Sequence, residues 1–142
     1  MIEEVVNEQK RFANDKGIQV TSEIIDCNIK GNYEMLKHAV SNLIQNAIKY
    51  NTENGKVHIE TKNINNELTI SVSDTGIGIF PDAQAHIFEP FYRENKQRTK
   101  KVGGAGLGLA IVKSIVEQHN GTIQYHPNEP KGSVFIITFH LQ

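Results

Sequence analysis

The hydrophobic positions along the chain follow two periods, which predict helices and strands. The clearest helix spans residues 33–50, where apolar side chains recur every three or four positions: Leu36, Val40, Leu43, Ile44, Ala47 and Ile48. Similar spacing predicts two further helices, at residues 2–16 and 105–120. A proline at a first helical position predicts a short helix at residues 81–88.

Alternating or β-branched stretches predict five strands, at residues 18–25, 56–62, 67–74, 121–126 and 133–141. The short link between the second and third strands favours an antiparallel hairpin. Because pairs of strands follow each other directly rather than alternating strictly with helices, we expect an α+β fold. It should be a two-layer sandwich, with a mixed five-stranded sheet and about three helices on one face.

Residues 89–104 have no steady apolar period and are rich in lysine and arginine. We expect a mobile basic loop there, which serves as a lid. No repeat or internal linker interrupts the pattern, so residues 1–142 are predicted to form a single domain.

Composition narrows the classes of function. The 142 residues carry a net charge of −1, so no global field favours nucleic acid or an anionic membrane. No apolar run approaches the roughly 18 residues of a membrane span, and no signal peptide is recognisable. A single cysteine, Cys27, rules out an internal disulfide and indicates a reducing, cytoplasmic setting.

The helix at 33–50 carries a second, polar face. Asn42, Asn46 and Lys49 lie four and three residues apart and therefore share one side. Asparagine is unfavourable within helices, so two of them in register need a reason. Amide oxygens suit Mg²⁺, and an ammonium group one turn on suits a phosphate. The alternative is a solvated polar face, and the helix alone does not decide between them.

The stretch DTGIGI, residues 74–79, places Asp74 at the end of a strand, before Gly76 and Gly78. The glycines allow a flat ligand to approach the backbone. A carboxylate only accepts hydrogen bonds, so it suits the amine of adenine and disfavours guanine, which presents a carbonyl there. The alternative is an ordinary Asp-Thr-Gly turn.

A second glycine-rich stretch, residues 103–113, opens the next helix with Gly104, Gly106 and Gly108. Exposed backbone N–H groups at a helix start bind anions. The spacing fits neither the dinucleotide fingerprint nor the P-loop. A flexible hinge is the alternative, and a lid also needs a hinge.

Taken in order, these stretches resemble a known set of motifs. NLIQNAIKYN, DTGIGI, FEPFYR, GGAGLGLAIV and GSVF resemble the N, G1, F, G2 and last glycine boxes of the catalytic ATP-binding domain of sensor histidine kinases. The resemblance covers nearly the whole chain. It implies the Bergerat ATP-binding fold, shared with gyrase, mismatch-repair and chaperone ATPases, and it implies ATP and Mg²⁺ as ligands.

The resemblance also implies roles for the matching residues. Asn46 would ligate Mg²⁺, Asn42 would contact phosphate or metal-bound water, and Asp74 would hold the adenine amine. Phe88 and Phe91 would anchor the base of the lid, with core packing as their alternative role. Further nucleotide contacts would come from Lys49, Tyr50, Gly76, Gly78, Ile79, Arg93, Arg98, Gly104, Gly106, Leu107, Gly108 and Ser133.

Catalysis would fall to Asn42, Lys49 and Arg93, with Arg93 as a candidate γ-phosphate contact. The family's phosphate-accepting histidine lies in a separate helical domain, in a motif that none of the six histidines matches. The implied partners are therefore ATP, that dimerisation domain and, indirectly, a response regulator. Nucleic acid and direct membrane contact are not expected. The domain would be cytoplasmic, in a parent protein that is a membrane-bound sensor.

Two alternatives remain. An anti-sigma-type serine kinase shares the implied fold but carries an acidic residue where this chain has Asn42, which cannot take a proton. A non-catalytic, nucleotide-gated interaction module is the other. Ala105 stands where the G2 box often has a hydroxyl residue, which puts one phosphate contact in doubt.

Overall fold

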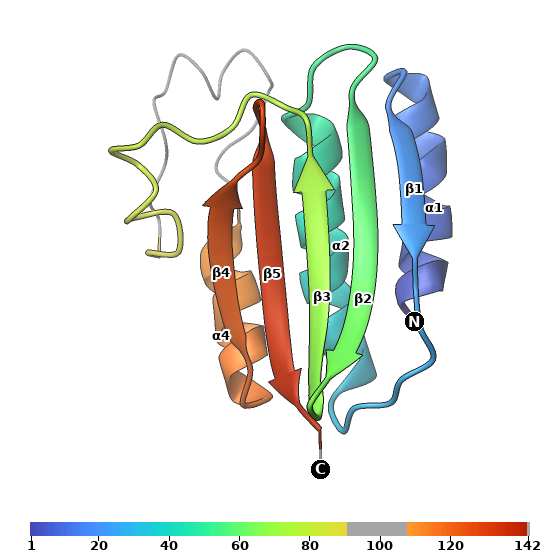
Figure 1. The fold of residues 1–142 in the computed structure, drawn as a ribbon, viewed down its shortest axis with the longest axis vertical. Coiled ribbons are helices and arrows are strands. Elements are labelled where there is room, and N and C mark those ends of the chain that lie inside the picture. Colours follow the sequence, from blue (N-terminus) through green and yellow to red (C-terminus); the bar gives the residue numbers. More distant parts are fainter. Residues whose placement is uncertain (91–107, 142) are drawn as a thin grey trace.

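The computed structural model describes residues 1–90 and 108–141, and these ranges form a sheet with helices packed on one face (Figure 1). The described helices are α1 (Ile2–Asp15), α2 (Tyr33–Lys49) and α4 (Leu109–Gln118). The strands are β1 (Gln19–Glu23), β2 (Lys56–Ile64), β3 (Glu67–Asp74), β4 (Thr122–Pro127) and β5 (Ser133–His140).

The sheet order is β1-β2-β3-β5-β4. Strand β1 pairs with β2 in parallel, and the other neighbours are antiparallel, so the sheet is mixed. The hairpin between β2 and β3 turns at Asn65 and Asn66, whose φ angles of 54° and 63° suit a tight turn. The predicted α+β sandwich is confirmed, with all three described helices on the same face.

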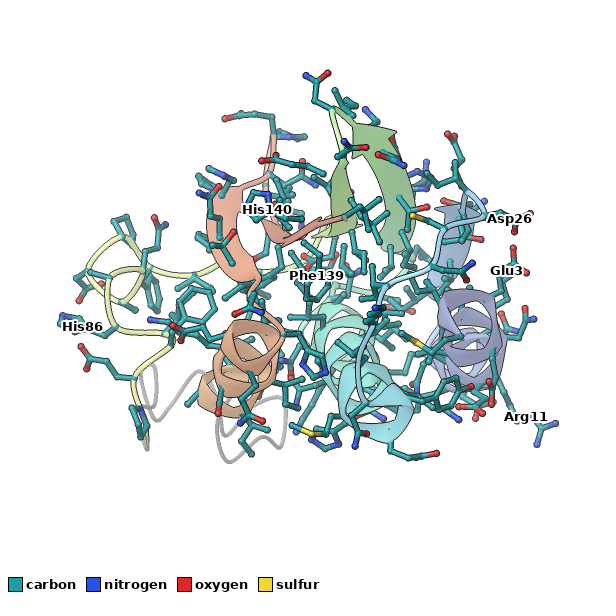
Figure 2. The ribbon with its side chains drawn as sticks, turned by 90° about the horizontal axis from the view of Figure 1, so that it is seen from below. Glu3, Arg11, Asp26, His86, Phe139 and His140 are labelled. Atoms are coloured by element: carbon teal, nitrogen blue, oxygen red, sulfur yellow. The ribbon has the colours of Figure 1, made fainter. Side chains whose placement is uncertain are left out.

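Helix α2 is the centre of the helical layer, because it contacts both α1 and α4. Its predicted apolar stripe is buried against the sheet. The Asn32 side chain caps its first turn by accepting a hydrogen bond from the Met35 N–H at 3.0 Å. Seen along the layers, Phe139 of β5 belongs to the core between sheet and helices, whereas His140 is exposed (Figure 2).

The short helix predicted at residues 81–88 is wrong. This segment forms consecutive turns, in which the N–H groups of Ala83, His86 and Glu89 each bond to the carbonyl three residues earlier. A helix does not propagate because most bonds of the ladder to the fourth preceding residue are missing. Ala83 and Ile87 bury their side chains although the segment is not a helix.

Some element bounds also differ from the prediction. Strand β1 ends at Glu23, two residues early, and α4 is described from Leu109. Asn120 adopts a left-handed conformation with φ of 59°, and the Gly121 N–H returns to the Val116 carbonyl at 2.9 Å. Helix α4 therefore ends just before the predicted position. Among the described helices, none has the length and apolar character to cross a bilayer.

Candidate functional site

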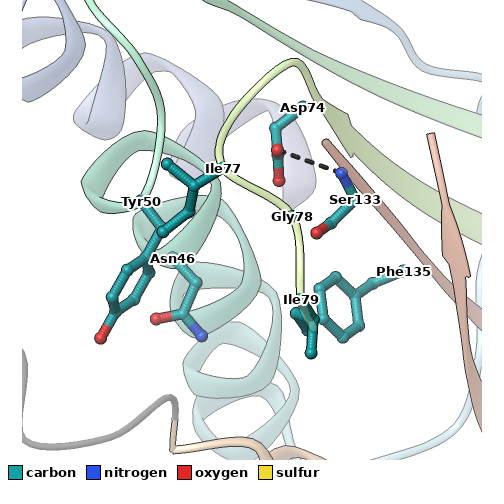
Figure 3. A pocket seen from close by; sticks show the side chains of 8 residues that line it. All are labelled: Asn46, Tyr50, Asp74, Ile77, Gly78, Ile79, Ser133 and Phe135. Atoms are coloured by element: carbon teal, nitrogen blue, oxygen red, sulfur yellow. Dashed lines mark hydrogen bonds between the residues drawn. The ribbon is translucent and has the colours of Figure 1, made fainter. Parts of the chain in front are cut away.

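A pocket opens between α2 and the ends of β3 and β5 (Figure 3). Asn46 reaches it from the last turn of α2 and Tyr50 from the residue that follows the helix, while Asp74 and Phe135 reach it from the sheet. The DTGIGI stretch passes between these two walls. The residues that line the pocket are Asn46, Tyr50, Asp74, Ile77, Gly78, Ile79, Ser133 and Phe135.

Asp74 is the buried charged group of this pocket, with 7% of its surface exposed. It is the last residue of β3 and pairs with Val57 of β2 on one side and Ser133 of β5 on the other. Its Oδ1 accepts hydrogen bonds from the N–H groups of Gly76 at 2.8 Å and Ser133 at 3.2 Å. Within residues 1–90 and 108–141, both hydrogen bonds to the carboxylate go to Oδ1 and none goes to Oδ2.

Burial raises the pKa of Asp74 from 3.8 to about 6, although the backbone hydrogen bonds from Gly76 and Ser133 oppose the rise. The carboxylate is therefore mainly ionised at neutral pH, but at a cost in folding free energy. A carboxylate that stays ionised although it is buried indicates a functional site.

Backbone contacts fix the turn that follows Asp74. The Ile77 N–H donates to the Tyr50 carbonyl at 3.1 Å, which joins the turn to the end of α2. A methyl group on Gly76 would collide with that carbonyl and come within 2.9 Å of the Asn51 Cα. Only glycine therefore allows this close approach.

A second close approach of backbone segments requires glycine on the β5 side. Gly132 has a φ of 109°, and a methyl group there would overlap the carbonyl oxygen of Asp74. The Asn128 side chain donates to that carbonyl at 2.8 Å. The carboxylate of Asp74 is thus held by a backbone that is packed on both sides.

The polar face of α2 forms the other wall. Asn46 Nδ2 donates to Asn42 Oδ1 at 3.0 Å, so the two amides orient each other. The ammonium group of Lys49 lies 5.6 Å from the centre of the Tyr50 ring. Gly108, the N-cap of α4, lies beside Asn42, since a methyl group on it would be 2.7 Å from Asn42 Nδ2.

The structure thus brings together most predicted site residues that it describes. Asn46, Tyr50, Asp74, Gly78, Ile79 and Ser133 line one pocket. Four others do not line the pocket but lie next to it. Asn42 bonds to Asn46 and Gly76 bonds to Asp74, while Lys49 lies near the Tyr50 ring and Gly108 lies beside Asn42. Phe88 packs edge-on to Phe135, with 6.4 Å between ring centres, so packing is at least part of its role. Outside the described residues lie Phe91, Arg93, Arg98, Gly104, Gly106 and Leu107.

Three further residues belong to the site and had no predicted role. Ile77 and Phe135 line the pocket, and Asn128 holds the backbone of Asp74. Ile77 and Phe135 lie within the DTGIGI and GSVF motifs, so their apolar character could have indicated that they line the pocket. Asn128 carried no such signal, because it is far from Asp74 in the sequence and contacts it only in the folded chain.

Comparison with known proteins places this geometry in a family. Residues 31–142 match the family described as histidine kinase-, DNA gyrase B-, and HSP90-like ATPase. The sensor histidine kinase RppB of Synechocystis sp. is 50% identical over 107 residues, which cover 75% of this chain and 24% of RppB. The heme sensor protein HssS of Staphylococcus aureus is 35% identical over 138 residues, covering 97% of this chain and 29% of HssS.

Solved structures of histidine kinases also resemble this chain. The catalytic domain of the histidine kinase ThkA, in a nucleotide-free form, superposes with a TM-score of 0.83 at 30% identity, over 98% of this chain and 89% of that one. Full-length ShkA in complex with AMPPNP gives a TM-score of 0.81 at 29% identity, over 99% of this chain and 30% of ShkA.

The chain spans about a quarter of the length of its sensor-kinase relatives RppB and HssS. The predicted resemblance to the catalytic ATP-binding domain of sensor histidine kinases is confirmed. The chain therefore belongs to the histidine kinase-, DNA gyrase B- and HSP90-like ATPase family.

Proposed function

We propose that this chain binds ATP with Mg²⁺ and donates the γ-phosphoryl group to a histidine on a separate helical domain. The observation that carries the proposal is the position of Asp74. A buried carboxylate uses one oxygen to hold two backbone N–H groups, in a pocket whose opposite wall carries Asn46.

The pocket chemistry suits adenine. The second oxygen of Asp74 is an acceptor for the exocyclic amine, whereas a guanine carbonyl at the same place would face a carboxylate. Ile77, Ile79 and Phe135 supply apolar surface for a flat ring. Membership of an ATPase family and the AMPPNP complex of ShkA support the same ligand.

The phosphates would lie along the polar face of α2. Asn46 offers an amide oxygen, a ligand type that Mg²⁺ accepts, and its rotamer is held by Asn42. Lys49 adds a positive charge about one turn further on. When bound, Mg²⁺ neutralises phosphate charge, and the contribution of the protein is mainly positioning.

The residue at position 42 argues for a histidine acceptor. An amide cannot remove a proton from a hydroxyl or a water, so Asn42 is no general base. An imidazole nitrogen attacks with its own lone pair. The new N–P bond forms as the bond from the γ-phosphorus to the bridging oxygen breaks, and ADP leaves.

We further propose that the partners of this chain are those of a sensor kinase. The acceptor would lie in a dimerisation domain of the parent protein, and a response regulator would receive the phosphoryl group later. A structure of ThkA in complex with the response regulator TrrA supports this proposal, with a TM-score of 0.81 at 28% identity, over 99% of this chain and 39% of that one. A cytoplasmic location in a membrane-bound parent also remains a proposal.

The experiment that tests this function is a phosphotransfer assay. This chain is mixed with γ-labelled ATP, Mg²⁺ and the helical segment encoded upstream of it, and the label on the segment is then characterised. We expect an acid-labile, base-stable label on a histidine. Asp74→Asn should abolish it, whereas Asp82→Asn, which removes an exposed carboxylate outside the pocket, should not.

Two outcomes would contradict the proposal. An acid-stable label on a serine of a partner would favour the serine kinase. ATP binding without label on any partner would favour the nucleotide-gated module.

A further inference from the structure

The outer face of the sheet carries a cluster of metal-ligating side chains that the nucleotide site does not use. In β2, Val57 and Ile59 point into the core, so His58 and Glu60 point to the opposite face, away from the helices. Glu23 of β1 pairs with Glu60 in the register of the two parallel strands. Three side chains from two adjacent strands therefore meet on a rigid backbone.

The spacing of these groups suits one cation. One ligand atom from each of Glu23, His58 and Glu60 lies within 4.8 Å of the others. His58 Nε2 and Glu60 Oε2 are 3.6 Å apart. Two ligands on a tetrahedral zinc ion are separated by about 3.3–3.6 Å, so this pair already has the required distance. Glu23, the third member of the cluster, is exposed to solvent.

Neighbouring residues hold two of the three ligands. The hydroxyl of Thr21 lies 2.7 Å from His58 Nδ1, so a protonated Nδ1 donates to Thr21 and leaves the lone pair of Nε2 for a metal. Lys62 bonds to Glu60 Oε1 at 3.1 Å, which leaves Oε2 on the His58 side.

We infer that Glu23, His58 and Glu60 form a site for a zinc-class divalent cation, with water completing the coordination. An imidazole nitrogen among the ligands favours Zn²⁺ over Mg²⁺ and Ca²⁺, which prefer oxygen. The site is on the opposite face of the sheet from the nucleotide pocket. Because β1 is an edge strand, the bound cation would clamp it to β2.

The test is a titration of this chain with zinc chloride in excess Mg²⁺, followed by calorimetry and thermal unfolding. We expect one ion per chain and a rise in melting temperature that EDTA reverses. His58→Gln and Glu60→Gln should each weaken binding by roughly 10–100-fold or more. Thr21→Val should weaken it less, because it removes only the partner of a ligand.

A matched control is available on the same face of the sheet. His140 lies 3.4 Å from Glu67 across the β3–β5 pair, which is a similar histidine–carboxylate pair without a third ligand among the described residues. His140→Gln should bind zinc as the parent chain does. Cys27→Ser should also leave binding unchanged, which excludes the thiol as the ligand.

A spectroscopic readout separates a ligand from a structural neighbour. In ¹⁵N spectra of the imidazole groups, zinc should shift the Nε2 resonance of His58 selectively. The inference would be overturned by no binding at millimolar zinc, by unchanged affinity in His58→Gln, or by a shift of another histidine instead.

Discussion

The two ends of the proposed nucleotide pocket are built differently. At the end proposed for adenine (the adenine end), Asp74 is buried and held by backbone groups of Gly76 and Ser133. At the end proposed for the phosphates (the phosphate end), Asn42, Asn46 and Lys49 are half-buried side chains of a single helix. There the described contacts join side chains to one another, by the amide pair and the lysine–tyrosine contact.

The difference has an energetic meaning. The adenine end is preorganised, so little ordering is needed on binding, but the domain bears the cost of a buried charge. The phosphate end bears little desolvation cost, but its described side chains are oriented by one another rather than by the backbone, so they lose more rotamer freedom than Asp74 when a ligand binds. Substitutions at the first end should therefore change both stability and binding, whereas those at the second should change mainly binding.

The largest effect should come from Asp74→Asn. We expect ATP affinity to fall by at least about 100-fold, because the acceptor for the adenine amine becomes a donor. The ligand-free domain should become more stable at pH 7.5 by up to about 3 kcal/mol, since the raised pKa marks a penalty on the charged form. Calorimetry and urea unfolding measure the two quantities.

The sign of that gain can be checked with pH. The penalty is fully present above a pKa of about 6 and absent below 3.8, the unperturbed value. The extra stability of Asp74→Asn should therefore disappear as the pH falls from 7 to below 4. A gain that grows on acidification would contradict the assigned pKa.

Gly132→Ala should be the most damaging backbone substitution of this end. The added methyl group would overlap the Asp74 carbonyl, and the φ of 109° is unfavourable for alanine. We expect a loss of about 2–4 kcal/mol in unfolding free energy. Gly17→Ala is the matched control, because its φ is 71° but its nearest neighbour would be 3.7 Å away. It should cost only about 1 kcal/mol, and equal losses would exclude the collision as the cause.

Asn46→Ala tests the phosphate end. We expect the dependence of ATP binding on Mg²⁺ to be lost, with a fall in affinity of about 10-fold, or roughly 1.4 kcal/mol, in saturating Mg²⁺. Unfolding free energy should change little beyond the helix preference of alanine. Binding that stays equally metal-dependent would show that another residue is the ligand.

The smallest expected effect is a pH dependence of adenosine binding. Adenosine is the ligand of choice because it has no phosphates that titrate. With the pKa of Asp74 at about 6, affinity should fall about four-fold between pH 7.5 and 5.5. A constant affinity across this range would mean that the protonated carboxyl binds equally well.

The sequence predicted most of the fold because its long elements are strongly periodic. The stripe of α2 and the alternation of β3 each had a single interpretation, and the structure confirms them. The segment 81–88 misled the prediction because Pro81 suits the first position of a helix and equally the second position of a β-turn, which it occupies here. A single proline does not show whether the ladder of backbone bonds continues.

The candidate site was predictable where it lies within motifs and not where it depends on tertiary contacts. Asp74, Asn46 and Gly78 were recognisable from residue type and order. The support from Asn128 and the collision at Gly132 arise from segments over 50 positions away in the sequence. No local pattern encodes such contacts, so only the folded arrangement shows why Asp74 is so firmly held.

Recognition of the adenine amine by Asp74 can be tested by base discrimination. The measurement compares the affinities of ATP and inosine triphosphate, which has a carbonyl in place of the amine. We expect a preference for ATP of at least about 100-fold, which Asp74→Asn should greatly reduce, because its amide can donate to a carbonyl. Equal affinity of the parent chain for the two nucleotides would contradict it.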